Sequence, residues 1–173
     1  KGGFDPLAEL GGSLLQAQAI DDAVLEIIPE EADVISLRVT NGILAAGLIE
    51  AISDEDLLAN RDAQPEELRG EAHMVSTFED PNGPQRVGRF GWKAQVATVL
   101  TFSADAAQNE MGLSNRFLPF DNAPNGDMER LKEWDNVPDP EDLPDSEGVE
   151  FIDRVTDFQR FVAQPPQTPR GAM

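Results

Sequence analysis

Residue types with redox and proton chemistry lie close together in one part of the chain. Residues 88–95 read GRFGWKAQ, and the pair Glu110 and Met111 begins eighteen residues after Trp92. An indole is easily oxidised and can relay an electron, whereas a positioned carboxylate can accept and return a proton. The spacing therefore suggests a redox site, which must be weighed against a purely structural explanation for each residue.

The same region is poor in acids although the chain is rich in them. Between Pro81 and Ala104 there is no Asp or Glu, while the 173 residues contain 33 acids in total. The cations of this window are Arg86, Arg89 and Lys93. One explanation is a buried segment that excludes acids. The other is an anion site, in which these cations face the carboxylates of a ligand.

The aromatic and acidic candidates also allow two interpretations. Phe90 and Trp92 occupy alternate positions, and aromatic residues at such positions are more often core than redox relay. Glu110 is expected at a helix C-terminus, where the helix dipole disfavours a negative charge. A carboxyl that holds its proton there suits a proton shuttle, but a solvated helix end explains the same position.

Composition narrows the function classes. The net charge of -20 disfavours nucleic acid and anionic membranes as partners, because phosphate binding needs clustered cations. Without cysteine there is no disulfide or thiolate chemistry, and a single histidine makes a metal cage or a Ser-His triad a poor fit. No apolar run approaches the roughly 20 residues of a membrane span.

The remaining candidates for a site are weaker. His73 in EAHMV is expected to be a loop or partly buried side chain. The run DPEDLPDSEG could hold calcium through its oxygen atoms, although it lacks the regular ligand spacing of a calcium loop. A solvated connector over residues 135–149 is the simpler explanation of its acids and prolines.

The periodicity of the apolar residues predicts a mainly α fold with long loops and a small β-hairpin. The hairpin is expected from the β-branched runs Val24–Ile28 and Val34–Val39. A buried helix is expected over residues 43–52, which are apolar nearly all round. The length fits residues 1–173 as a single domain or a fragment of a larger protein.

Further helices follow from caps and from three- and four-residue apolar steps. Ser53 is expected to cap a helix, with Asp56 as the acid of a short capping box. An amphipathic helix is expected over Ala94–Met111, ended by Gly112. A short helix should cover residues 128–134. In the last helix, Phe151, Val155, Phe158 and Val162 should share one stripe, and PPQTP should end it.

Four segments together resemble a known family. They are FDPLAELGGSLLQ, GLIEAISD, GRFGWKAQVATVLTFSADAAQNEMGLSNRFLP and FQRFVAQPPQTPRGAM. The chain looks like the bacterial di-haem oxidoreductases, also called thiol oxidoreductases, which are related to the di-haem cytochrome c peroxidases. Members carry two CxxCH haem-attachment motifs, and this chain has neither. The resemblance therefore implies the cytochrome-c-peroxidase-like region between the two motifs, which alone is expected to be inactive.

The resemblance assigns roles by position. Peroxidase relatives have an FWDGRA-like motif and, further on, an NPxEM-like one. Trp92 matches their inter-haem electron relay, Glu110 their acid-base residue, and Met111 a neighbour in the distal pocket. Arg89, Phe90 and Lys93 are expected to contact the haem, with the two cations pairing propionates. Two departures bear on peroxidase activity: many relatives have GDMG where this chain has NEMG, and the glutamine of peroxidases has no clear match here.

The family also implies cofactors, partners and location. Two c-type haems would be attached outside this segment, on the flanking haem domains of the same polypeptide. A small electron-transfer cytochrome is the expected external partner, and the location would be periplasmic or secreted. A different class of function stays open on the residues alone: a non-catalytic scaffold or protein-interaction domain, in which residues 92–111 are core.

Overall fold

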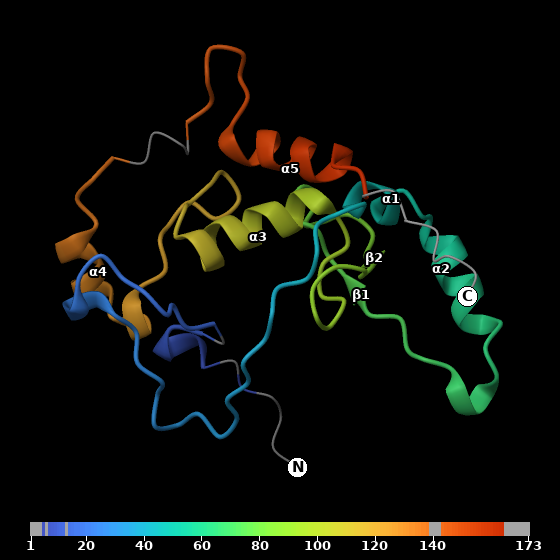
Figure 1. The fold of residues 1–173 in the computed structure, drawn as a ribbon, viewed down its shortest axis with the longest axis horizontal. Coiled ribbons are helices and arrows are strands. Elements are labelled where there is room, and N and C mark those ends of the chain that lie inside the picture. Colours follow the sequence, from blue (N-terminus) through green and yellow to red (C-terminus); the bar gives the residue numbers. More distant parts are fainter. Residues whose placement is uncertain (1–4, 6, 13, 139–142, 165–173) are drawn as a thin grey trace, which may run out of the picture. The chain divides into compact units, whose positions relative to one another are not determined.

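The computed structural model describes residues 5, 7–12, 14–138 and 143–164, and they form two compact units. The first unit combines residues 1–39 with 104–151, and the second combines residues 40–103 with 152–173. Helices joined by long loops dominate both units, with one two-stranded antiparallel sheet among the described residues (Figure 1). The predicted fold class, mainly α with long loops and a small sheet, is confirmed.

The first unit is held largely by hydrogen bonds between its loops. Its short elements are η1 (Ala8–Leu10), η2 (Asp22–Val24), η4 (Pro124–Gly126) and α4 (Met128–Trp134). The Glu26 carboxylate accepts from the backbone N–H groups of Gln16 and Asn125, at 2.6 and 3.3 Å. The Asp127 side chain caps α4 by accepting from the Arg130 N–H at 3.0 Å. The predicted short helix over residues 128–134 is therefore confirmed.

The predicted hairpin in this unit is wrong. Val24 belongs to η2, and residues 25–39 form turns and coil. The side chains of Val34 and Leu37 are 84% and 99% exposed, so they have no sheet or core beneath them. β-Branched runs favour an extended backbone, but a strand needs a paired neighbour and a packing surface, and neither is present here.

The second unit contains the sheet and the helices that surround it. Its elements before α3 are α1 (Ala46–Glu50), α2 (Asp54–Asp62), η3 (Glu66–Leu68), β1 (Met74–Val75) and β2 (Arg86–Val87). Met74 lies opposite Val87 and Val75 opposite Arg86 in the antiparallel pair. The predicted cap of α2 is confirmed, because Ser53 Oγ accepts from the Asp56 N–H at 3.0 Å.

Helix α3 (Val99–Met111) is deeply buried along one face. Val99, Ala104 and Ala107 are at most 3% exposed. The helix ends at Gly112, as predicted, and that residue adopts φ 68°, a left-handed conformation that glycine adopts without strain. The predicted start at Ala94 is wrong, because Ala94 has φ 49° and Val96 forms a β-bridge with Phe90.

The prediction of a buried helix over residues 43–52 needs correction, whereas the last helix forms as expected. The helix expected over residues 43–52 is only the five residues of α1, and its Leu48 is 74% exposed. Helix α5 (Phe151–Phe161) forms as expected, but its buried residues are Ile152, Thr156 and Gln159, while Phe158 is 60% exposed. The buried face is thus rotated relative to the predicted aromatic stripe. None of the helices in the described residues is long and apolar enough to cross a membrane.

Candidate functional site

Trp92 lies at the tip of a tight turn in the second unit. The turn is closed by hydrogen bonds between Phe90 and Val96, with N···O distances of 2.9 and 3.3 Å, and Gly91 adopts φ 79° inside it. This geometry leaves the Trp92 side chain 55% exposed. Trp92 is therefore not a core residue, although its sequence position favoured that interpretation. Its indole ring is accessible to a neighbouring group.

The residues beside Trp92 differ from one another in exposure. Phe90 is half-buried, and its ring centroid lies 6.2 Å from that of Phe102 on α3. Lys93 is exposed, and its backbone N–H donates to Gln95 Oε1 at 3.0 Å while its carbonyl faces His73 Nδ1 at 3.3 Å. His73 thus contacts the turn that carries Trp92, a position that its sequence context did not indicate.

Arg89 is engaged by groups of its own unit. Its side chain is only 4% exposed and forms an ion pair with Asp54 at the start of α2. Its guanidinium also donates to the backbone carbonyls of Val87, Glu50 and Ile52. Arg86 joins the same carboxylate, with Nε 3.0 Å from Asp54 Oδ2. Two cations of the acid-poor window thus face a carboxylate that lies more than thirty positions earlier in the chain.

The ionisation of Asp54 reflects these partners. Burial by itself raises the pKa of Asp54, but the Arg86 hydrogen bond, the Val87 N–H and the nearby arginine charges lower the pKa overall. The Val87 N–H donates to Asp54 Oδ2 at 3.0 Å. Asp54 is therefore ionised at neutral pH and links α2 to β2 and to the segment before Trp92.

A second internal ion pair anchors the start of α3. Glu50 Oε2 lies 2.7 Å from Arg160 Nε on α5, and Glu50 Oε1 accepts from the Val99 N–H, also at 2.7 Å. Burial raises the pKa of Glu50, but the bonds from Arg160 and Val99 outweigh it and lower the pKa overall. A carboxylate at this place is favoured by the positive end of the helix dipole. Sequence reasoning did not identify Glu50, because its partners are 49 and 110 residues away.

Glu110 and Met111 form the C-terminal end of α3, in the first unit. Both are exposed, with Met111 61% exposed. Gly112 directly after them turns the chain away from the helix axis, and its N–H donates to the Gln108 carbonyl at 3.2 Å. The predicted position of Glu110 at a helix C-terminus is confirmed, and its carboxyl group is accessible to a ligand on that side.

A partly buried carboxyl group on the same helix was missed by sequence reasoning. Burial raises the pKa of Asp105, and the hydrogen bond from Asn109 Nδ2, at 3.1 Å, offsets only part of that effect. Asn122 Nδ2 in turn donates to Asn109 Oδ1 at 2.9 Å. The sequence did contain an indication of this contact. Asp105 and Asn109 are four residues apart, so they lie on the same face of a helix.

Replacing Asp105 with Asn is expected to stabilise the protein at neutral pH. The raised pKa means that the folded state binds the Asp105 proton more tightly than the unfolded state does. Stability is therefore lost as pH rises from the ordinary aspartate range through the folded-state pKa. Urea unfolding at several pH values should give Asp105→Asn a larger free energy of unfolding than the wild type at pH 7. This difference should disappear at acidic pH. The control is Glu129→Gln, because Glu129 is exposed. An equal increase in stability in both variants would show that the burial of Asp105 is not the cause.

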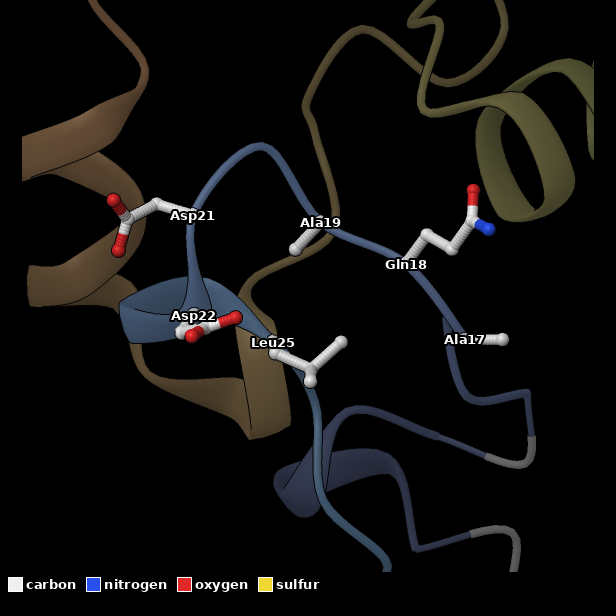
Figure 2. Close-up of a pocket in the computed structure, with 6 residues that line it drawn as sticks. All are labelled: Ala17, Gln18, Ala19, Asp21, Asp22 and Leu25. Carbon is white, nitrogen blue, oxygen red and sulfur yellow. The ribbon is translucent and has the colours of Figure 1, made fainter.

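Among the described residues, each unit also contains a hollow. The first, of about 320 Å³, is lined by Ala17, Gln18, Ala19, Asp21, Asp22 and Leu25. Figure 2 shows that its polar side chains do not converge, since Gln18 and Asp21 point to different sides. Asp21 already caps η2 by accepting from the Ala23 N–H at 2.9 Å. This hollow therefore has no set of groups aimed at a common ligand.

The hollow in the second unit is smaller and largely apolar. Its volume is about 140 Å³, and its wall includes Ile43, Ile49, Arg89, Phe90, Phe102 and Gln159. It adjoins the turn that carries Trp92, because Phe90 and Gly91 line it. Among the described residues no group of three or more His, Cys, Asp or Glu side chains could hold a metal ion. Residues 139–142 of the proposed calcium run lie outside the described residues.

A comparison with protein families identifies the family of this chain. Residues 18–129, more than half of the chain, match the family described as "Di-haem oxidoreductase, putative peroxidase". The chain belongs to this family. The match includes Trp92, Glu110 and the whole of α3, and it confirms the resemblance inferred from the sequence. The comparisons with curated proteins and with solved structures gave no match.

The side chains of this di-haem oxidoreductase chain include groups of the kinds that can contact a haem, but none that could attach one through a thioether. The family name implies two haems, whereas the chain has no cysteine that could form a thioether. Trp92 and Met111 are more than half exposed, and Glu110 is exposed beside Met111. Trp92 offers an aromatic face in the second unit, whereas Met111 and Glu110 offer a thioether and a carboxyl group in the first. Attachment, by contrast, requires residues other than those of this sequence.

Proposed function

We propose that this chain forms the region between the two haem motifs of a peroxidase-like di-haem oxidoreductase. The observation that carries the proposal is the family match together with an exposed indole and an exposed carboxyl group at the positions expected from the resemblance. The haem domains of the same polypeptide would flank it, and a small cytochrome would exchange electrons with it. The family resemblance favours a periplasmic or secreted location.

In this proposal Glu110 acts as the acid-base residue. Its carboxylate takes a proton from one oxygen of a bound hydrogen peroxide molecule and returns it to the other. That transfer makes water the leaving group when the O–O bond breaks, and two electrons together with two protons from solvent balance the reduction of peroxide to two water molecules. A haem iron would supply the position at which peroxide binds and the electrons. Met111, which is exposed beside Glu110, would line the same pocket.

Trp92 is proposed as an electron relay between the two haems. An indole is oxidised more readily than the other aromatic side chains except that of tyrosine, and this chain contains no tyrosine. Its 55% exposed position on a short turn allows a cofactor to pack directly on the ring. The ion pair of Arg89 with Asp54 would fix the base of that turn, three residues before the indole.

The cationic residues would contribute to haem binding in different ways. Lys93 is exposed next to Trp92 and is proposed to contact a propionate. Phe90 would support the turn from inside through its contact with Phe102. Arg89 is 4% exposed and already paired, so a direct propionate contact would require its bond to Asp54 to open. We therefore propose that Arg89 acts mainly by positioning the Trp92 turn.

Replacing Trp92 with Phe tests the relay. Phenylalanine keeps an aromatic face for packing but is much harder to oxidise, so electron transfer between the haems should slow by about tenfold or more, which corresponds to roughly 1.4 kcal/mol in the barrier. The measurement is stopped-flow spectroscopy of the half-reduced haem-loaded protein. The matched control is Trp134→Phe on α4, which should leave the rate unchanged. Equal transfer rates in the wild type and in Trp92→Phe would exclude the relay.

A further inference from the structure

The small hollow of the second unit has several features of a ligand site. Its aromatic wall comes from Phe90 and Phe102, whose ring centroids are 6.2 Å apart, and its aliphatic wall includes Val99 and Ile49. Val99 is 1% exposed, so this part of the wall belongs to the packed core of the unit. Small-molecule sites are typically such apolar concavities with a few well-placed polar groups.

One polar side chain of the wall has a hydrogen-bond acceptor without a partner. Gln159 on α5 is 7% exposed, and its Nε2 donates to Ser103 Oγ at 3.2 Å. The Ser103 hydroxyl donates in turn to the Val99 carbonyl at 2.8 Å, so it is not available to Gln159 as a donor. The amide oxygen Oε1 of Gln159 is buried without a hydrogen-bond partner. Leaving such an acceptor unpaired is unfavourable, and a ligand donor would remove that cost.

The charged residue of the wall argues against an anionic ligand. Arg89 reaches the hollow, but its guanidinium is committed to Asp54 and to backbone carbonyls. An anion would have to compete with the Asp54 carboxylate for these donors. A neutral ligand would leave that network intact and would need only one donor for Gln159.

The volume sets the size of the ligand. At about 140 Å³ the hollow is close to the apolar cavity of about 150 Å³ that is known to hold benzene in another protein. We propose that this hollow binds a small neutral phenol, with the ring packed against the Phe90–Phe102 pair and the hydroxyl group donating to Gln159 Oε1. This site is distinct from the proposed acid-base residue Glu110 and does not depend on the peroxidase proposal.

The test compares phenol with toluene, which has the same number of heavy atoms but no donor. Both are titrated calorimetrically into the intact haem-loaded protein without peroxide. In the variant Gln159→Met the affinity ratio of phenol to toluene should fall by about tenfold, because one net hydrogen bond is lost. The matched control is Gln108→Met on α3, whose side chain donates to the Phe120 carbonyl away from the hollow.

Several results would overturn the proposal. These are no phenol binding to the wild type, an unchanged ratio in Gln159→Met, or an equal fall in Gln108→Met. Circular dichroism checks that each variant is folded. If Gln159→Met does not fold, cross-relaxation NMR on the wild type decides the question. Contacts from phenol ring protons to Phe90 and Phe102 support the site, and their absence at saturating phenol contradicts it.

Discussion

Replacing Glu110 with Gln is expected to lower peroxide turnover by about 10²- to 10⁴-fold, the usual contribution of a positioned acid-base residue. Glutamine has nearly the same shape but cannot accept and return a proton. Because Glu110 is exposed at the end of α3, the substitution should leave the fold unchanged. Turnover is measured with the haem-loaded protein and a reduced electron donor, and the visible haem spectrum should stay nearly the same.

The control for this prediction is a carboxylate on another helix of the same unit. Glu129→Gln on the exposed side of α4 removes the same charge and should keep full turnover. Asp105→Asn adds a second comparison, because Asp105 is the carboxyl group of α3 with a raised pKa. If Asp105→Asn abolishes turnover while Glu110→Gln does not, the acid-base role belongs to Asp105 instead.

Replacing Asp54 with Ala is expected to destabilise the protein by about 2–4 kcal/mol, somewhat below the usual loss for a fully buried pair. The Asp54 side chain is 19% exposed, but its partner Arg89 is 4% exposed and would keep an uncompensated charge. The Val87 N–H would lose its acceptor as well. Denaturant unfolding at pH 7 gives the free energy of unfolding, and the variant should also loosen the turn that carries Trp92.

An exposed ion pair provides the contrast. Arg61 and Asp62 are neighbours on α2, with side chains 35% and 59% exposed, so Asp62→Ala should change stability little. In the double variant Asp54→Ala/Arg89→Met, part of the loss should be recovered because the buried charge is gone. If Asp54→Ala lowers the free energy of unfolding no more than Asp62→Ala does, the Arg89–Asp54 ion pair does not stabilise the unit more than an exposed pair.

Local structure could be predicted where the determinants are neighbours in the chain. The cap of α2 by Ser53, the end of α3 at Gly112 and the helix over residues 128–134 each depend on residues within one turn. The expected hairpin failed for the opposite reason. The runs after Val24 and Val34 have the residue types of strands, but the sheet forms between Met74–Val75 and Arg86–Val87 instead. Pairing partners are chosen by tertiary packing.

The candidate site shows the same division. The four segments that resemble the family, which include Trp92, Glu110 and Met111, indicate the family from sequence alone, and the family match over residues 18–129 agrees. Their exposure could not be read from the sequence, since aromatic residues at alternate positions are usually buried. Trp92 escapes burial because the bridge between Phe90 and Val96 closes a turn that projects its side chain outward.

The sequence by itself determined the helical class, the local caps, the absence of thiolate chemistry and the membership in a di-haem oxidoreductase family. Only the tertiary structure decided the partners of the cations in the acid-poor window and of Arg160. Arg86 and Arg89 pair with Asp54, and Arg160 with Glu50, across separations of 32 to 110 residues. Charges attract according to their distance in space, and a charge pattern along the chain does not contain that distance.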